Sequence, residues 1–275
     1  MKTINSDQYR KLLYRALSEF DSFCRKNKIQ YSLIGGSLIG SVREGGIIPW
    51  DDDIDVIMTK DNYQKFLSEY QKNNSGRYQI KSHAIDKNFT FPFIKFVDTY
   101  TVLEDAGISG SLDNYGIFLD VFAYNYTSND FNKRKKQHRK INSLIRMVNK
   151  ANTSQEGTST VRKIARFAKN TFRAIIGTNR ICEILNREGK KYSNTDYMLS
   201  NWPIYSFEKE VQKTSDIEAG YIDIQFGPVK AMIFKNYDNI LQTTFGDYMT
   251  PPPKNQQKAH ALKAYRKEGY EPKED

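Results

Sequence analysis

The spacing of apolar residues along the chain predicts an alternation of helices and strands. From Asn5 to Lys26 apolar side chains recur every three or four positions, as on one face of a helix, with Ser6 or Asp7 as its cap. The same period predicts helices over residues 37–44, 61–71 and 236–248. Apolar runs predict strands over residues 29–34, 51–58, 90–104, 115–124, 220–226 and 229–234. Helices interleaved with strands indicate an α/β (α+β) chain.

Residues 45–58, GGIIPWDDDIDVIM, place four aspartates in strand-like sequence. Side chains alternate between the faces of an extended strand, so Asp51, Asp53 and Asp55 are predicted to share one face while Ile54 enters the core. Three like charges on one face repel one another unless a cation lies among them. Carboxylate oxygens at this density suit Mg²⁺ or Mn²⁺ that also holds substrate phosphates. The alternative is a solvated acidic turn, which the apolar alternation disfavours.

Two further segments are predicted to meet this aspartate run. The strand over residues 29–34 leads into Gly35-Gly36-Ser37, where glycine lets the backbone approach a ligand and the helix start offers amide groups to phosphate. A later run of strand length, YGIFLDVFAY, is almost wholly apolar but carries Asp120. A metal held by carboxylates and bridging nucleotide phosphates is typical of phosphoryl or nucleotidyl transfer.

Together these segments resemble the nucleotidyltransferase superfamily typified by DNA polymerase beta, and more specifically the LicD family. The stretch GGSLIGSVREGGIIPWDDDIDV is similar to the LicD signature, and FLDVFAY to that family's apolar-Asp-apolar block. FKNYDNILQTTFGDYMTPPP followed by His260 is similar to its C-terminal block, which makes His260 a weak candidate near the donor. The resemblance covers both ends of the chain but not the basic middle. It implies a nucleotidyltransferase-like mixed β-sheet flanked by helices.

Carried over residue by residue, the resemblance implies roles for five positions. Asp53, Asp55 and Asp120 become ligands of Mg²⁺ or Mn²⁺, and Asp120 is also expected to orient or deprotonate the acceptor hydroxyl. Gly36 and Ser37 become contacts to the donor phosphates. The family more often has Thr where Ser37 stands, a change that keeps the hydroxyl.

Other residues have two interpretations each. Arg43 either neutralises the donor diphosphate or pairs with a neighbouring carboxylate, and Trp50 either stacks on a base or choline headgroup or belongs to the core. Lys95 and Asp98 either contact substrate or lie on the surface. Asp51 either ligates the metal directly or supports a residue that does.

The charge is concentrated in the middle of the chain. The whole sequence has 275 residues and a net charge of +10, whereas residues 131–191 hold 17 basic and three acidic side chains, a net +14. We therefore expect a basic helical insertion at about residues 131–200, with a basic amphipathic helix over residues 160–177. It either lies on anionic lipid, guides an anionic glycan or lipid-diphosphate acceptor, or packs its apolar side and leaves its charges in solvent.

One catalytic domain over residues 1–275 is predicted, with a disordered tail at 263–275. The N-terminus has no signal-peptide pattern, and no apolar run is long enough to cross a membrane. Cys24 and Cys182 show neither a disulfide nor a metal-ligand pattern. We expect a cytoplasmic protein, with possible peripheral contact at the inner face of the plasma membrane.

The resemblance implies transfer of phosphocholine, or a related alcohol phosphate, from CDP-choline or a CDP-polyol. The acceptor would be a sugar hydroxyl of a cell-envelope glycan, a lipid-linked glycan or a teichoic acid precursor, and CMP would be released. Fukutin-like ribitol-phosphate transferases are relatives. One alternative is nucleotidyl transfer from an NTP to a small molecule, with release of pyrophosphate. A nucleic-acid binder on an inactive transferase scaffold ranks last, since the interleaved aromatic platform for single strands is missing.

Overall fold

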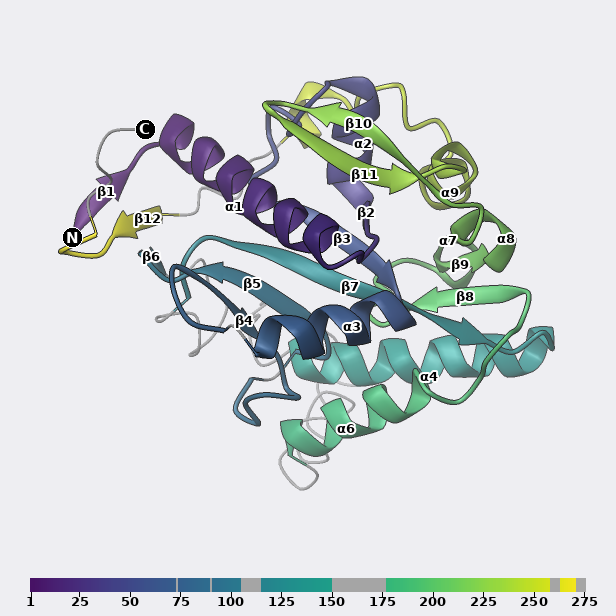
Figure 1. Cartoon of the computed structure of the whole chain (residues 1–275). Helices are drawn as coiled ribbons and strands as arrows, with labels where there is room; N and C mark the ends of the chain where they lie inside the picture. Colours follow the sequence, from purple (N-terminus) through teal and green to yellow (C-terminus); the bar gives the residue numbers. More distant parts are fainter. Residues whose placement is uncertain (73, 90, 105–114, 150–176, 258–262, 271–275) are drawn as a thin grey trace, which may run out of the picture.

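A seven-stranded mixed sheet forms the centre of the protein (Figure 1). The computed structural model describes residues 1–270 except 73, 90, 105–114, 150–176 and 258–262. Five strands follow one another across the sheet: β2 (Ser32–Leu33), β3 (Asp55–Thr59), β7 (Phe118–Thr127), β5 (Ile94–Asp98) and β4 (Tyr78–Lys81). Two more, β8 (Tyr197–Ser200) and β9 (Val211–Lys213), continue beside the far end of β7. Only the β3–β7 pair is parallel in this sheet. The expected mixed α/β architecture is confirmed.

Two helices cover one face of the central sheet, α1 (Ser6–Lys26) and α3 (Lys60–Gln71) (Figure 1). Their apolar stripes pack on β3, β5 and β7 in the largest core cluster. The cap of α1 is Asn5 rather than Ser6 or Asp7: its side chain accepts from the Gln8 backbone N–H, and the Gln8 side chain accepts from the Asn5 N–H. This reciprocal pair satisfies two amide groups that the helix itself leaves unbonded.

A smaller layer packs above the start of β3. It consists of α2 (Gly35–Arg43), the hairpin of β10 (Tyr221–Phe226) and β11 (Val229–Phe234), and α9 (Tyr237–Phe245). Two single-turn helices, α7 (Phe207–Glu210) and α8 (Thr214–Ile217), lie beside α9, and a 3-10 turn follows at Lys254–Gln256. This layer places the first turn of α2 and the side of α9 next to the β3–β7 pair.

The C-terminal segment corrects the expectation of a disordered tail. Residues Lys263–Arg266 form β12, the middle strand of a three-stranded sheet between β1 (Lys2–Ile4) and β6 (Thr101–Glu104). Backbone hydrogen bonds to both neighbours and the burial of Ala264 order this charged stretch, which has too few apolar side chains for a sequence pattern to reveal it.

Two predicted strands differ from those in the structure. The aspartate strand begins at Asp55, and Asp51–Ile54 precede it without strand pairing. The expected strand over 90–104 is divided into β5 and β6 by a turn at Thr99–Tyr100. In both places the composition is strand-like, but the backbone does not form the regular hydrogen bonds that pair one strand with the next.

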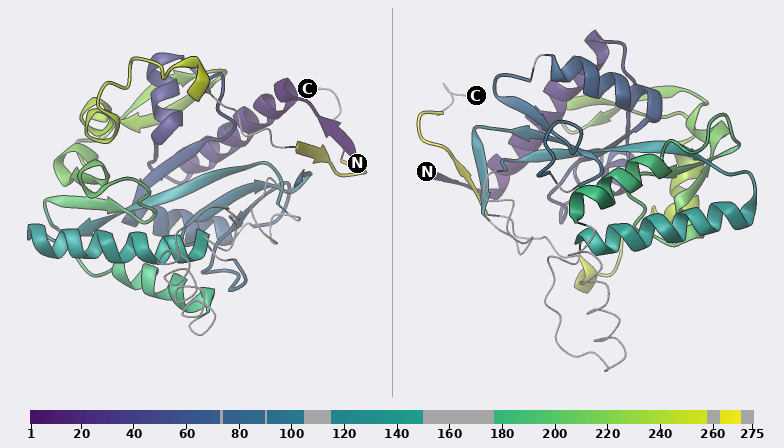
Figure 2. Two further views of the ribbon diagram at one scale, coloured as in Figure 1. Left: turned by 180° about the vertical axis from the view of Figure 1, so that it is seen from behind. Right: turned by 90° about the horizontal axis from the view of Figure 1, so that it is seen from below.

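The basic insertion is helical where the structure describes it. Helices α4 (Phe131–Asn149) and α6 (Thr178–Glu188) lie side by side and share an apolar cluster (Figure 2). The segment 131–200 ends in β8, however, which belongs to the central sheet. The expected basic helix at 160–177 lies outside the described residues, apart from Gly177. Among the helices that the structure describes, none is apolar over a length that would cross a membrane.

Candidate functional site

Carboxylates from two neighbouring strands meet at one cavity. Because β3 and β7 are parallel, Asp55 at the start of β3 lies directly opposite Asp120 in β7. Together with Asp53 they line a cavity of about 270 Å³, which the first turn of α2 borders through Gly35 and Gly36. The structure therefore brings together four of the predicted site residues: Gly36, Asp53, Asp55 and Asp120.

These carboxylates lie close together with little compensating charge. Burial, followed by the charges of Asp51 and Asp120, raises the pKa of the Asp53 carboxyl to about 8. The pKa of Asp55 is raised even more clearly by burial and then by Asp53 and Asp120. Charged groups removed from water in this way favour a bound cation or proton. The electrostatics of the cavity thus suit a divalent cation.

Lys95, in strand β5 of the central sheet, forms an ion pair with one of these carboxylates. It lies opposite Asp120 across the antiparallel β5–β7 pair, with Nζ 2.5 Å from Asp120 Oδ1. The Lys95 side chain is buried, and its ammonium lies 3.4 Å from the ring centroid of Phe118. Of its two predicted interpretations, surface display is therefore wrong.

Glycine and serine at the start of α2 fit tightly against the aspartates. A Cβ at Gly36 would lie 2.4 Å from Asp51 Oδ2, so only glycine leaves room for that carboxylate. The buried Ser37 hydroxyl accepts a hydrogen bond of 2.9 Å from the Asp55 backbone N–H. Ser37 thus fixes the start of β3, while Gly36 borders the cavity.

Three consecutive aspartates form a second possible ligand set. One oxygen each from Asp51, Asp52 and Asp53 lies within 4.8 Å of the others, the only such group among the described residues. Asp53 belongs both to this set and to the predicted set with Asp55 and Asp120. It is the carboxylate that the two arrangements share.

Comparison with known proteins gives the same picture. Residues 28–146 match the family model described as "LicD/FKTN/FKRP, nucleotidyltransferase domain". The chain is 27% identical over 278 aligned positions to the lipopolysaccharide cholinephosphotransferase LicD of Haemophilus influenzae, covering 95% of this chain and 98% of that protein. Residues 28–146 are thus similar to the LicD nucleotidyltransferase domain, and the chain as a whole is similar to the Haemophilus cholinephosphotransferase. Uncharacterized proteins of Rickettsia typhi and Rickettsia prowazekii are 37% and 38% identical over 76 and 63 residues, about a quarter of each chain.

Arg43 and Trp50, inside the LicD domain, do not line the cavity. The Arg43 guanidinium donates to the Tyr248 backbone carbonyl at 2.8 Å and to Glu44 at 2.9 Å, and it lies 5.9 Å from the Trp50 ring centroid. Both side chains therefore connect α2 to the C-terminal segment. Their position supports the predicted structural roles rather than a donor contact.

Asp98 is likewise remote from the cavity. Its fully buried carboxylate forms a two-point ion pair with the Arg77 guanidinium, at 3.0 and 2.8 Å, and accepts from the Tyr100 backbone N–H. Both interpretations offered by the sequence, substrate contact and surface display, are wrong for this residue. His260 lies outside the described residues.

Sequence reasoning missed the wall opposite the aspartates. This wall is mainly apolar and aromatic, with one buried carboxylate. Phe122 and Tyr124 come from β7, and seven residues lie beyond the segment that matches the family model: Trp202, Ile204, Tyr205, Glu210, Ile240, Leu241 and Phe245. Ser200, Lys209, Gln212 and Thr244 add polar groups to the lining. Glu210 accepts hydrogen bonds from the backbone N–H groups of Ile204 and Tyr205, at 2.7 and 2.6 Å, and burial raises its pKa to about 7. Phe122 and Tyr124 belong to the block around Asp120, and Ile240, Leu241 and Phe245 to the C-terminal block. No motif marks Trp202, Ile204, Tyr205 or Glu210, and Glu210 reaches the site through the packing of α7 against α9.

Arg10 of α1 is a second residue that the sequence did not reveal. Its guanidinium donates to the backbone carbonyls of Ile48 and Pro49, at 3.3 and 2.5 Å, with a longer contact to that of Asp51. These bonds hold the loop that carries the aspartates against α1. Arg10 therefore acts through the backbone and does not reach the cavity.

Proposed function

We propose that this protein transfers choline phosphate, or a related alcohol phosphate, from a CDP-activated donor to a sugar hydroxyl, with release of CMP. The acceptor would be a cell-envelope glycan, such as a lipopolysaccharide or a teichoic acid precursor. The observation that carries the proposal is the single cavity in which Asp53, Asp55 and Asp120 face the start of α2. The Haemophilus relative, which aligns over nearly the whole chain, is itself named as a cholinephosphotransferase.

In this proposal Mg²⁺ or Mn²⁺ would be held by Asp53, Asp55 and Asp120. The chemistry of this set suits such an ion, because hard carboxylate oxygens predominate and burial raises the pKa values of all three groups. Among the described residues, however, only Asp51, Asp52 and Asp53 have carboxylate oxygens that all lie within 4.8 Å of one another, so binding would require Asp53, Asp55 and Asp120 to move closer together. When bound, the ion would supply positive charge to the diphosphate of the donor. Asp51 is close enough to Asp53 to serve as a further ligand.

The residues of the chain would divide the transfer between them. Free backbone amides at Gly35 and Gly36, in the first turn of α2, would bind the donor phosphates. The acceptor oxygen would attack the phosphorus that carries the alcohol, and the bond from that phosphorus to the CMP oxygen would break. Asp120 would take the hydroxyl proton, held in place and kept anionic by Lys95.

The wall opposite the aspartates supports choline as the alcohol. A trimethylammonium group donates no strong hydrogen bond and is bound by aromatic faces and by negative charge. Trp202, Tyr205 and Phe245 provide rings, and Glu210 provides a buried carboxylate with no ion-pair partner among the described residues.

Release of CMP tests the proposal. CDP-choline, CDP-glycerol and CDP-ribitol would each be incubated with Mg²⁺, a cell-envelope glycan extract and either the natural chain or Asp53→Asn. We expect release from CDP-choline, at least about a hundredfold slower in the variant because a metal ligand is lost. Asp61→Asn, on the exposed face of α3, is the matched control and should keep full activity.

Other outcomes would redirect the assignment. Release from CDP-ribitol or CDP-glycerol alone would contradict the choline assignment and keep the reaction class. Pyrophosphate release from an NTP, without CMP release from any CDP-alcohol, would replace the proposal with nucleotidyl transfer.

A further inference from the structure

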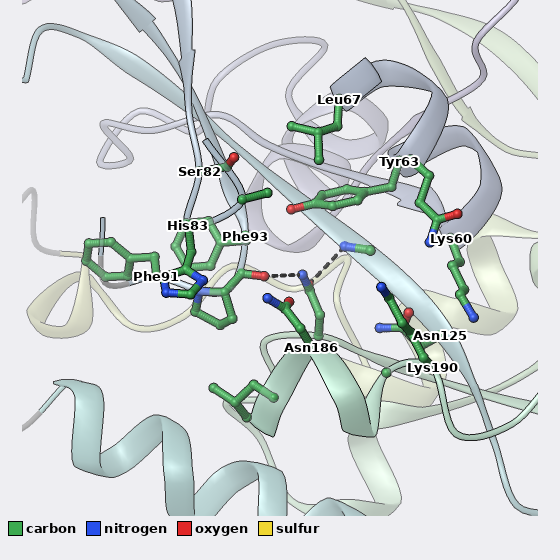
Figure 3. A pocket seen from close by; sticks show the side chains of 17 residues that line it. Lys60, Tyr63, Leu67, Ser82, His83, Phe91, Phe93, Asn125, Asn186 and Lys190 are labelled. Carbon is green, nitrogen blue, oxygen red and sulfur yellow. Dashed lines mark hydrogen bonds between the residues drawn. The ribbon is translucent and has the colours of Figure 1, made fainter. Parts of the chain in front are cut away.

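A second cavity, of about 180 Å³, lies on the opposite face of the central sheet, between α3 and the end of α6 (Figure 3). Strand β7 separates the two cavities. Phe122 and Tyr124 point to the aspartate cavity, whereas the alternate residues Ala123 and Asn125 line the second one. The second cavity therefore contains none of the aspartates assigned to transfer.

The second cavity lies where the sheet has a local gap. Strands β5 and β8 both pair with the same edge of β7, β5 with its first half and β8 with its last. Between them the Asn201 side chain closes the gap, accepting from the Ala123 N–H and donating to the Pro92 carbonyl, both at 2.9 Å. The floor of the cavity is thus a hydrogen-bonded side chain rather than a continuous strand.

Positive charge dominates the lining. Lys60 from α3 and Lys190 after α6 lie on one side of the cavity, and His83 lies across from them (Figure 3). Neither lysine has an ion-pair partner among the described residues, and no described residue of the lining is acidic. The carboxylates of Asp86 and Glu183 act on His83 from outside this lining. Two unpaired ammonium groups at a cavity favour an anionic ligand.

Buried polar groups of the lining lack partners. Ser82 and His83 are both at least 96% buried. The Ser82 hydroxyl and the His83 Nε2 atom nevertheless make no hydrogen bond within the described structure. Unsatisfied buried groups cost stability, and a ligand that bonds to them removes that cost. Phe91 and Phe93 add aromatic faces, and the Asn186 amide lies beside them at the entrance. This combination suits a ligand with hydroxyl groups and an apolar ring face.

We propose that this cavity binds a small phosphorylated sugar. The phosphate would lie between Lys60 and Lys190, and the sugar would lie against Phe91 and Phe93 with its hydroxyls near Ser82 and His83. The ligand is not the group being transferred, because β7 and Asn201 separate it from Asp53, Asp55 and Asp120. The proposal is independent of the transfer reaction.

A ligand in the second cavity would affect the aspartate cavity through contacts between the side chains that line the two. The Trp202 ring lines the aspartate cavity and packs edge-on against Phe93 and Phe91, with ring centroids 4.9 and 6.0 Å apart. Both phenylalanines line the second cavity. This aromatic contact connects the linings of the two cavities beside Asn201.

Calorimetric titration of the whole chain with ribose 5-phosphate, ribose and inorganic phosphate tests the proposal. We expect saturable binding of ribose 5-phosphate and at least about tenfold weaker binding of either fragment, because each lacks one set of contacts. Lys60→Gln and Lys190→Gln should each weaken binding of ribose 5-phosphate by about tenfold. Lys191→Gln, one residue away and outside the lining, is the matched control. Asp53→Asn should bind as the natural chain does.

Three results would overturn the proposal: no saturable binding of ribose 5-phosphate, binding that both lysine variants retain, or binding that Asp53→Asn abolishes. Equal affinity for inorganic phosphate would overturn its sugar component. If a lysine variant fails to fold, Trp50→Phe leaves Trp202 as the one tryptophan of the chain. A saturating change in its emission with ribose 5-phosphate supports the site, and constant emission contradicts it.

Discussion

Lys95 and Asp120 face each other across two neighbouring strands and form a buried ion pair in the floor of the candidate site. The ammonium opposes the effect of burial on the pKa of Asp120. Within the part of the chain that the structure describes, Asp53 and Asp55 form no ion pair with a lysine, although the charge of Lys95 opposes the rise that burial causes in the pKa of Asp55. The sheet thus holds one carboxylate with its counter-charge and leaves two that favour an added cation.

Replacing Lys95 by Met should destabilise the fold. The variant leaves the Asp120 carboxylate buried and without its partner, a change that costs about 3 kcal/mol. The free energy of unfolding from urea titration at pH 7 measures this loss. Lys72→Met is the control, because its ion pair with Glu69 is exposed and contributes less than about 1 kcal/mol. Equal stability of the two variants would contradict the role given to Lys95.

Two glycines of α2 should respond differently to alanine. At Gly36 the new Cβ would meet the Asp51 carboxylate, which can move, so Gly36→Ala should retain most of its stability and lose turnover by at least about tenfold. At Gly40 the Cβ would lie 2.4 Å from the Gly46 backbone carbonyl, so Gly40→Ala should lower the unfolding free energy by about 2 kcal/mol. Thermal unfolding and CMP release, measured on both variants, separate the effects. A Gly36→Ala variant with full activity would show that the position of the Asp51 carboxylate against Gly36 is not needed for turnover.

Glu210 should make stability depend on pH. Burial raises its pKa to about 7 in the folded chain, above the ordinary value of 4.5, so the folded state holds this proton more tightly than the unfolded state. Its contribution to stability is therefore fully present below about pH 4.5 and is lost as the pH rises to about 7, a change of about 3 kcal/mol. Urea titrations of the natural chain and Glu210→Gln, both in EDTA, measure it, since contributions from Asp53 cancel in the difference. Parallel curves for the two proteins would rule out the buried carboxylate.

Arg43 should matter to stability more than to the donor. Arg43→Leu removes the hydrogen bond to the Tyr248 carbonyl and the charge beside Glu44, which should lower the unfolding free energy by about 1–2 kcal/mol. The KM for CDP-choline should stay within about threefold of the natural value, because the side chain does not line the cavity. A large rise in KM with unchanged stability would restore the donor contact that the sequence left open.

Local sequence was sufficient for most helices and for the identity of the key carboxylates. The period of apolar residues located α1, α3 and α9 within a few residues, and the almost continuous apolar run around Asp120 located β7, since both patterns lie within one segment. The glycine and aspartate motifs were enough to single out Gly36, Asp53, Asp55 and Asp120. The metal and the donor remain predictions.

Contacts between distant segments decided the rest. Lys95 could not be assigned from its own neighbours, because its role depends on the register of β5 against β7. Glu210 and Trp202 reach the cavity only through the packing of α7 and β8, and β12 forms only because β1 and β6 offer two free edges. The sequence by itself determined which segments are helical and which residues can bind cation and phosphate. The tertiary structure decided which charges face one another, because burial and strand register depend on residues of different segments, such as Asp55 and Lys95 with Asp120, and these set the pairing and the pKa of each group.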